Sequence, residues 1–96
     1  MRVIWRRRAS NDLEVIHKYI FKDSPQNATL VFNKIHDLAE TLIIFPEKHP
    51  IEPVFNDPEI RFLVIWSYKI MYTFDKKSVA ILRVFDTRRN PKKLKP

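Results

Sequence analysis

Basic side chains gather in the last 36 residues of this 96-residue chain. The residues concerned are Arg61, Arg83, Arg88, Arg89, Lys92 and Lys93. The planar guanidinium group of arginine donates two parallel hydrogen bonds to a phosphate, whereas the lysine ammonium acts as a point charge. If these side chains lie on an exposed face of the molecule or at its rim, we expect them to bind the phosphate groups of a target.

Three histidines are the other candidates for chemistry. His49 follows Glu47 and Lys48 in a proline-rich segment, where this trio could face a substrate. His17 and His36 fall on or beside the apolar stripes of two expected helices, where packing is the ordinary role. Their spacing matches no metal-ligand pattern and the chain has no cysteine, so we expect neither a metal site nor a cofactor.

The composition is that of a small, basic protein. The hydrophobic content of 45% is enough for one core, and we expect a single domain over residues 1–96. The net charge of +7 favours a polyanionic partner such as nucleic acid, the ribosome or an acidic protein segment. The absence of glycine excludes a glycine-rich phosphate loop. No apolar run approaches the roughly 20 residues of a membrane span, so we expect a cytoplasmic protein without membrane contact.

The first half of the chain predicts one short strand and two helices. The β-prone run within Met1–Arg6 fits a strand. From Arg7 to Lys22, apolar residues recur every three or four positions, as they do on one face of a helix. Ser24 and Pro25 suit the cap and first position of a second helix, whose apolar stripe continues to Leu42. Because the connection is so short, the two helices must run antiparallel.

The second half predicts three strands after a stiff loop over residues 47–59, in which prolines prevent regular pairing. The strands are Ile60–Trp66, Tyr68–Phe74 and Val79–Phe85, all rich in β-branched and aromatic residues. In the middle strand, Tyr68, Ile70, Tyr72 and Phe74 share one face, which we place under the helices. The predicted fold is therefore α+β, with an N-terminal strand and an antiparallel helical hairpin packed on a mainly antiparallel sheet.

The length of the turn before the last strand decides where Arg83 lies. A change of one residue in the pairing register moves every side chain of a strand to the other face of the sheet. A two-residue turn at positions 76–77 would set Arg83 opposite Ile70, on the core face. A three-residue loop would set Arg83 beside Lys69, facing solvent. Burying an unpaired arginine costs free energy. We therefore prefer the three-residue loop.

The residues and their order resemble the RelE/ParE superfamily of bacterial type II toxins. The family's first helix is matched by Trp5, Ala9, Asp12-Leu13, Ile16 and Tyr19-Ile20. Its interhelical turn and second-helix end are matched by Ser24-Pro25, Ala28, Leu42 and Phe45-Pro46. Its closing sheet is matched by Arg61, Tyr68 to Tyr72, Ile81 to Phe85 and Arg88-Arg89. The similarity extends over nearly the whole chain.

The resemblance implies a toxin that arrests growth, often within a plasmid stabilization module. A small acidic antitoxin, encoded beside the toxin, would neutralise it and form a hetero-oligomer with it. Two activities occur in the superfamily. ParE-like members poison DNA gyrase, whereas RelE-like members cleave mRNA in the ribosomal A site. In a nuclease, Arg61 and Arg88 match by position the family arginines that hold the phosphate.

The C-terminal segment departs from the pattern of the nucleases. Cleavage at a 2′-hydroxyl needs a base, cations on the phosphate and an acid for the leaving oxygen. Many ribosome-dependent members carry a tyrosine or histidine there, whereas this chain has Asp86, Asn90 and Leu94. Asp86 stands where many relatives have a histidine, and neighbouring arginines would lower its pKa and leave it a poor acid. We therefore expect a toxin that is not an enzyme and that acts by binding gyrase.

Two alternatives remain open. The chain could be a ribosome-dependent endoribonuclease (an mRNA interferase) that uses Arg61 and Arg88 on the phosphate and Asp86 or His49 for proton transfer. It could also be a basic RNA- or ribosome-binding domain without toxicity, because the charge alone would permit such binding.

Overall fold

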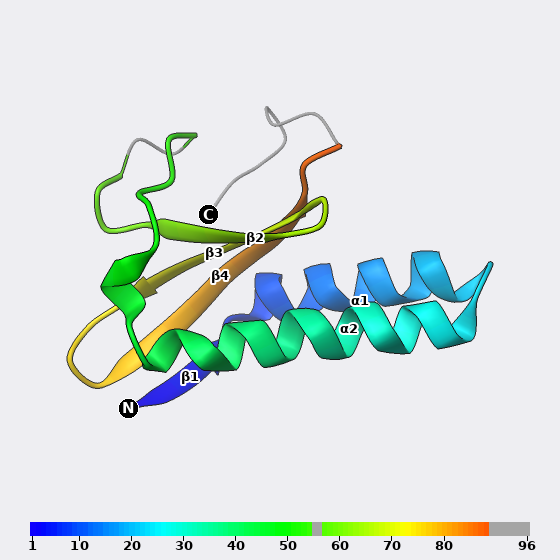
Figure 1. Cartoon of the computed structure of the whole chain (residues 1–96), viewed down its shortest axis with the longest axis horizontal. Coiled ribbons are helices and arrows are strands. Elements are labelled where there is room, and N and C mark those ends of the chain that lie inside the picture. Colours follow the sequence, from blue (N-terminus) through cyan, green and yellow to red (C-terminus); the bar gives the residue numbers. More distant parts are fainter. Residues whose placement is uncertain (55–56, 89–96) are drawn as a thin grey trace.

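A computed structural model describes residues 1–54 and 57–88 of the chain (Figure 1). In chain order its helices and strands are β1 (Arg2–Trp5), α1 (Arg7–Phe21), α2 (Pro25–Glu40), β2 (Arg61–Ile65), β3 (Tyr68–Phe74) and β4 (Ser78–Asp86). Two short 3₁₀ helices follow α2, namely η1 (Thr41–Ile43) and η2 (Pro46–Lys48). The α+β class and the order of elements predicted from the sequence are confirmed.

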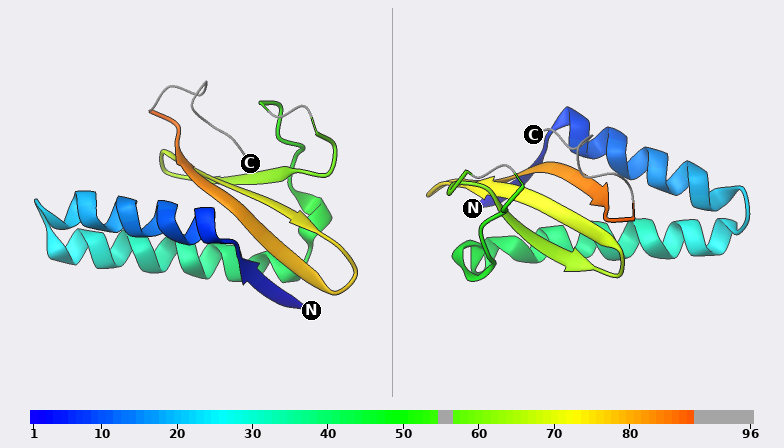
Figure 2. Two further views of the ribbon diagram at one scale, coloured as in Figure 1. Left: turned by 180° about the vertical axis from the view of Figure 1, so that it is seen from behind. Right: turned by 90° about the horizontal axis from the view of Figure 1, so that it is seen from above.

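The four strands form one mixed sheet in the order β1-β4-β3-β2. β1 runs parallel to β4, while β3 pairs antiparallel with both β4 and β2. The first and last strands in the sequence are therefore neighbours, and both helices lie against the same face of the sheet (Figure 2). The sheet is mainly antiparallel, as predicted, with one parallel pair.

The main core lies between the helical hairpin and the sheet. The Oγ atom of Ser24 accepts a hydrogen bond from the N–H of Asn27 at 3.2 Å, and Pro25 occupies the first turn of α2, as the sequence predicts. The buried residues of this core are Ala9, Leu13, Ile35, Ala39, Leu42, Tyr68, Ile70, Tyr72, Val79, Ile81 and Val84. The face of β3 that we placed under the helices is therefore confirmed. Each large apolar side chain buried here contributes about 1.5–3 kcal/mol.

The turn before β4 is the shorter of the two that we considered. Phe74 pairs with Val79, and the N–H of Asp75 donates to the carbonyl of Ser78 at 3.0 Å. The carboxylate of Asp75 also accepts hydrogen bonds from backbone N–H groups within the turn. An aspartate that bonds the backbone in this way closes a tight turn without glycine. The preferred three-residue loop was wrong.

A β-bulge further along β4 returns Arg83 to the sheet face that the longer loop would have given it, although opposite Met71 rather than Lys69. Tyr72 pairs with Ile81, whereas the preceding residue Met71 pairs with Arg83. The extra residue, Leu82, is thus inserted in β4 without a partner of its own on β3. Arg83 consequently avoids the position opposite Ile70 on the core face. It does not face solvent, however, because α1 supplies a partner for it.

The proline-rich segment covers part of the sheet face that lies away from the helices. Ile60 and Met71 are buried there, and Phe62, Leu82 and Phe85 pack against them. The segment also lies along the outer edge of β2, where the N–H of Phe62 donates to the carbonyl of Pro50 at 3.0 Å. The sequence predicted a stiff loop but not this smaller second core.

A buried ion pair fixes the same segment to the sheet. The side chain of Glu52 is fully buried, and its carboxylate lies 2.9 Å from Nζ of Lys69. That carboxylate also accepts a hydrogen bond from the N–H of Val54 at 2.9 Å, and the Lys69 ammonium lies 4.5 Å from the centre of the Phe62 ring. Removing one partner of such a pair leaves an uncompensated charge, which costs about 3–5 kcal/mol.

Candidate functional site

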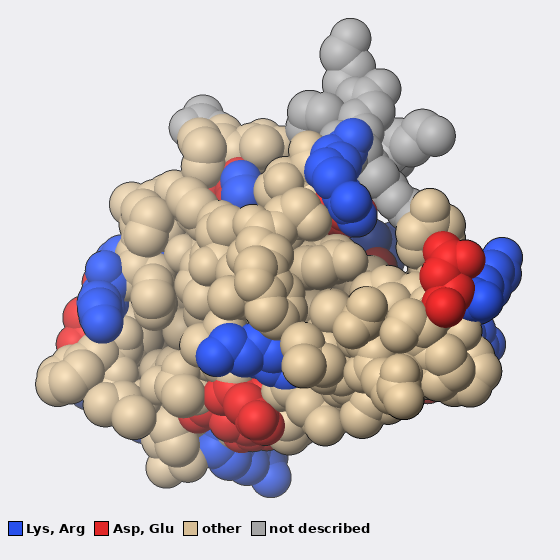
Figure 3. All heavy atoms as spheres, turned by 45° about the vertical axis from the view of Figure 1, so that its right-hand side comes forward, with Lys and Arg blue, Asp and Glu red and all other residues tan. Residues whose placement is uncertain are grey.

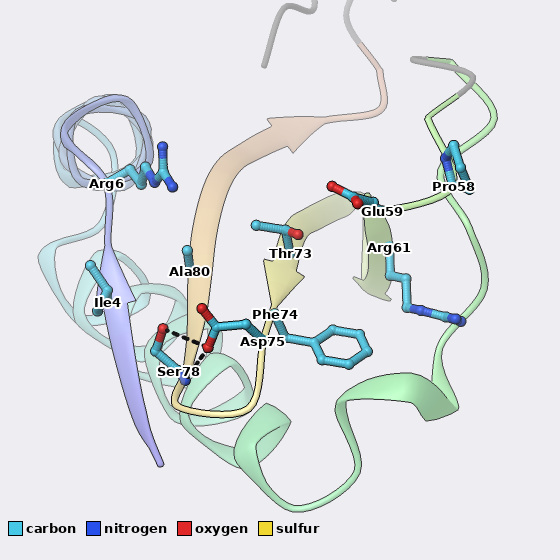
Figure 4. Close-up of a pocket in the computed structure, with 10 residues that line it drawn as sticks. All are labelled: Ile4, Arg6, Pro58, Glu59, Arg61, Thr73, Phe74, Asp75, Ser78 and Ala80. Atoms are coloured by element: carbon cyan, nitrogen blue, oxygen red, sulfur yellow. Dashed lines mark hydrogen bonds between the residues drawn. The ribbon is translucent and has the colours of Figure 1, made fainter.

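Arg61 begins β2, pairs with Tyr72 of β3, and extends away from the strands (Figure 4). Its guanidinium donates to the backbone carbonyl of Glu47 at 3.1 Å and to that of His49 at 2.7 Å. It also lies 5.8 Å from the centre of the Phe74 ring. Arg61 therefore holds the segment after α2 against the sheet. It does so with N–H groups that could otherwise donate hydrogen bonds to a phosphate.

His49 and Tyr72 are brought close to Arg61, but neither is suited to donate a proton. Burial, followed by the charge of Lys48, lowers the pKa of His49, so its imidazole is largely neutral at pH 7. The ring packs edge-on against Tyr72 with centroids 6.2 Å apart. Tyr72 is fully buried and donates its O–H to the carbonyl of Pro46. Burial raises the pKa of Tyr72 to about 12.

Arg83 is held by Asp12 of α1. Its Nε atom lies 2.7 Å from Oδ2 of Asp12, and a terminal nitrogen lies 3.0 Å from Oδ1. The same carboxylate accepts the N–H of Val84 at 2.9 Å, in the part of β4 that extends beyond its pairing with β1. The side chains of Arg83 and Asp12 are only 19% and 17% exposed, and the bond to Asp12 raises the pKa of Arg83. This bidentate pair joins the first helix to the last strand.

Asp86 and Arg88 form a second bidentate pair at the end of β4. A terminal nitrogen of Arg88 lies 2.7 Å from Oδ2 of Asp86, and both Nε and the backbone N–H of Arg88 lie 3.0 Å from Oδ1. These bonds lower the pKa of Asp86, as the sequence led us to expect. The carboxylate is therefore ionised at neutral pH and cannot act as an acid. The side chain of Arg88 remains 67% exposed.

The described basic residues do not converge on one point. Arg83 and Asp86 line a cavity of about 290 Å³ between α1 and β4. Arg61 lines a different cavity of about 530 Å³, whose floor includes Thr73 and Ala80 on the sheet face away from the helices (Figure 4). The predicted target-binding residues Arg89, Lys92 and Lys93 lie outside the described residues.

The space-filling view agrees with this separation. On the face shown in Figure 3, lysine and arginine side chains are scattered, and most of them lie next to an acidic side chain. Most of that face is formed by other residues. Within residues 1–54 and 57–88, no group of three or more histidine, aspartate or glutamate side chains could hold a metal ion. No helix in this part of the chain is long and apolar enough to cross a membrane.

Sequence reasoning missed the residue that holds Arg83 in place. Asp12 is 71 positions from Arg83, and a local pattern contains no signal for a contact over that separation. Trp66, the last residue of the strand predicted from the sequence, lies in the turn between β2 and β3 with a φ angle of 52°. That left-handed conformation is unusual for a bulky residue. Trp66 is 54% exposed in this turn. The chain contains no glycine, the residue that ordinarily adopts this conformation.

The fold is that of the superfamily which the sequence resembles, a sheet of four strands backed by a helical hairpin. Residues 3–91 match the family model described as ParE toxin of type II toxin-antitoxin system, parDE. The chain therefore belongs to the ParE toxin family, within the predicted RelE/ParE superfamily.

One solved structure with a similar fold is described as a chromosomal ParDE TA system from P. aeruginosa. The similar chain in it shares 24% sequence identity with a TM-score of 0.73, over 88% of this chain and 92% of that chain. At this identity the likeness shows the fold alone. No curated protein matches the chain.

Proposed function

We propose that this chain is a growth-arresting toxin that poisons DNA gyrase and is neutralised by a small acidic antitoxin. Membership of the ParE toxin family supports the assignment as a toxin. The choice of binding over RNA cleavage rests on one observation, the bidentate pair between Asp86 and Arg88.

RNA cleavage needs a group that can donate a proton to the leaving oxygen. Asp86 is the carboxylate in the position of the family's catalytic residue, and its lowered pKa leaves it without a proton at pH 7. Near Arg61, His49 is largely neutral and Tyr72 is buried. Neither Asp86 nor His49, the two proton-transfer candidates named from the sequence, is a suitable acid. These properties favour a toxin that holds its target rather than cleaving it.

Contact with the target is assigned to the end of β4 and the residues after it. Arg88 keeps much of its guanidinium exposed while Asp86 fixes its orientation. Arg89, Lys92 and Lys93 add positive charge in the sequence that follows. Arg61 and Arg83 would contribute indirectly, because their donors are used within the fold.

The antitoxin is assigned by charge and apolar surface. The net charge of +7 complements an acidic segment. Large apolar side chains are exposed on the helical hairpin, namely Val15, Tyr19, Phe21 and Leu30. An acidic segment with apolar residues that folds on binding would cover such a surface.

A gyrase assay with an RNA-cleavage assay beside it tests the proposal. Purified chain is added to gyrase, relaxed plasmid and ATP, and the DNA is then treated with detergent and protease. We expect less supercoiling and an accumulation of linear plasmid, both reversed by the acidic protein encoded beside the toxin. In parallel, ribosomes translating an mRNA are incubated with the chain, and cut sites are mapped by primer extension.

Matched variants give each outcome a meaning. Arg88→Ala and the double variant Lys92→Ala, Lys93→Ala should weaken gyrase inhibition, whereas Lys34→Ala, on the exposed side of α2, should not. Codon-phased cuts that disappear in Arg61→Ala and Arg88→Ala would replace the proposal with the endoribonuclease alternative. Absence of any growth effect on expression without the antitoxin would favour a non-toxic RNA- or ribosome-binding domain.

A further inference from the structure

Three consecutive arginines, Arg6, Arg7 and Arg8, lie where β1 passes into α1, and all three are exposed. Within residues 1–54 and 57–88, no acidic side chain forms an ion pair with Arg6 or Arg7. The first turn of α1 contains no acidic residue, and no side chain caps it. Arg6 and Arg7 therefore place positive charge at this end of the helix without an acidic partner among the described residues.

Such a placement is unfavourable for the fold. The N-terminus of a helix carries the positive end of the helix dipole, so cations there are repelled, and adjacent cations repel one another. At the other end of the same helix, Lys18 lies where the dipole favours a cation. The stability of the fold therefore does not explain Arg6 and Arg7. Binding of an anion would.

The backbone that carries these side chains is firmly placed. The N–H of Arg6 donates to the carbonyl of Ile81 at 3.1 Å, which extends the pairing of β1 with β4 by one residue. The carbonyl of Arg6 accepts the N–H of Ser10 at 3.0 Å, in the first turn of α1. A ligand that binds here would meet side chains on fixed backbone, which lowers the entropy lost on binding.

Two neighbouring hollows share Arg6. One, of about 410 Å³, is lined by Arg6, Arg7, Arg8 and the bulged residue Leu82. The other, of about 530 Å³, is the cavity over Ala80 on the sheet face away from the helices, and Figure 4 shows Arg6 reaching toward it from the end of β1. Because Arg6 lines both hollows, a ligand bound to Arg6 can extend into either of them.

Acidic residues limit where an anion would bind within these two hollows. Glu59 and Asp75 line the larger hollow. The carboxylate of Asp75 accepts the N–H groups of Lys77 and Ser78 at 2.7 and 2.9 Å, so it is engaged in its own turn. Glu59 would repel a phosphate at its end of the larger hollow. The smaller hollow has no acidic residue in its lining, and it is the favourable place for an anion.

We propose that the hollow bounded by Arg6, Arg7 and Arg8 binds the phosphodiester backbone of a nucleic acid. The guanidinium groups of Arg6 and Arg7 can each bind a phosphate through two N–H groups, and a nucleic acid presents closely and evenly spaced phosphates to such neighbouring arginines. The apolar side chain of Leu82 forms no hydrogen bonds that could distinguish one base from another, so binding should be independent of sequence. The proposal does not depend on gyrase being the target, because it concerns a different surface from the end of β4.

The test measures binding of the full chain to short fluorescent DNA by anisotropy, with gyrase absent, at about 50 to 200 mM salt. A duplex and a single strand are compared for wild type and for the double variant Arg6→Ala, Arg7→Ala. We expect the double variant to lose affinity by roughly fivefold to tenfold per arginine at 100 mM salt. The slope of log K against log salt should fall by about 1 for each arginine removed.

Two control variants separate this site from general attraction to a basic chain. Lys34→Ala removes one exposed charge on α2, across the sheet from the hollows, and should bind DNA nearly as wild type does. Glu59→Gln removes the repelling carboxylate and should tighten binding a few-fold. Circular dichroism and urea unfolding confirm that each variant is folded.

Dependence on Arg6 and Arg7 in either DNA form supports the proposal, and the tighter form shows whether a duplex or a single strand is preferred. A double variant with the wild-type slope would overturn it, since binding would then come from the basic residues after β4. An equal loss in Lys34→Ala would also overturn it. So would competition by polyglutamate as strong as that by DNA, which would assign the surface to an acidic protein.

Discussion

The arginines of this protein form two groups that differ in what holds them. Arg61, Arg83 and Arg88 each donate to an oxygen of the same chain, in two cases to a carboxylate and in one case to two backbone carbonyls. Arg6 and Arg7 are exposed at the start of α1, and no acidic side chain of the described residues pairs with them. The five side chains carry the same charge.

The difference teaches that net charge does not locate a binding surface. A buried arginine paired with a carboxylate adds nothing to the net charge of +7, because the two charges cancel. The hydrogen-bond donors of such an arginine are also already used within the fold. An arginine without a partner contributes its whole charge and all its donors to the surface. We therefore expect mutation of Arg61 or Arg83 to act mainly through stability and mutation of Arg6 or Arg7 to act through binding, while Arg88, which is paired but 67% exposed, should show both effects.

The largest effect should come from Asp12→Ala. It leaves the mostly buried guanidinium of Arg83 without its carboxylate and the N–H of Val84 without an acceptor, so we expect a loss of about 3 kcal/mol in the free energy of unfolding. Urea unfolding followed by circular dichroism measures it. The control is Glu14→Ala, an exposed carboxylate two positions along α1, for which we expect a change below about 0.5 kcal/mol. Equal, small changes in both would mean that Asp12 does not hold Arg83.

Arg61→Ala should have the next largest effect. It removes two charge-assisted hydrogen bonds to the carbonyls of Glu47 and His49, and we expect a loss of about 2 kcal/mol. The loss should be local as well as global, because the segment that covers the second core is released. Hydrogen exchange at the N–H of Phe62, which donates to Pro50 in that segment, should accelerate. If exchange at Phe62 is unchanged while DNA or gyrase binding falls, Arg61 belongs with the exposed group instead.

Sequence patterns were sufficient for most of the fold, because each element's signal lies within the element. The alternation of Tyr68, Ile70 and Tyr72 identified the buried face of β3, and Ser24-Pro25 identified the start of α2. These signals depend on local periodicity and capping, which the chain expresses over a few residues.

The sites were less predictable, because they depend on contacts between distant residues. The bulge at Leu82 sets the register of Arg83, yet nothing in the strand sequence marks it. Asp12 meets Arg83 only once the helix is packed beside β4. The burial of Glu52 with Lys69 likewise depends on how the proline-rich segment crosses the sheet. Sequence analysis could name the arginines but could not tell which of them the fold would use.

A smaller effect is expected for Arg88→Ala, and pH reveals it. Bonding to Arg88 lowers the pKa of Asp86, so the stabilisation that Asp86 supplies is present above its ordinary value of 3.8 and is lost as the pH falls through the lowered folded value. Arg88→Ala should move the pKa of Asp86 upward in an NMR titration and weaken the loss of stability in acid.

Asp75 provides the internal control for that titration. Its pKa is also lowered, but by the backbone N–H groups of Lys77 and Ser78, so Arg88→Ala should leave it in place. A parallel shift of Asp75 and Asp86 would indicate a general change in charge rather than the loss of one pair. An unmoved Asp86 would mean that Arg88 is as unrestrained in solution as Arg7.

The smallest effect on stability, and one of opposite sign, is expected for Arg7→Glu. Replacing a cation by an anion in the first turn of α1 favours the helix dipole, so the free energy of unfolding should rise by about 0.3–1 kcal/mol. Lys18→Glu, in the last turn of the same helix, exchanges the same charges at the other end of the dipole and should lower stability by a similar amount. Urea unfolding at low salt measures both, and added salt should shrink both. A clear loss of stability in Arg7→Glu would show that Arg7 supports the fold and belongs with Arg61 and Arg83. A gain in stability accompanied by lost DNA binding would show that Arg7 lowers the stability of the helix and serves binding instead.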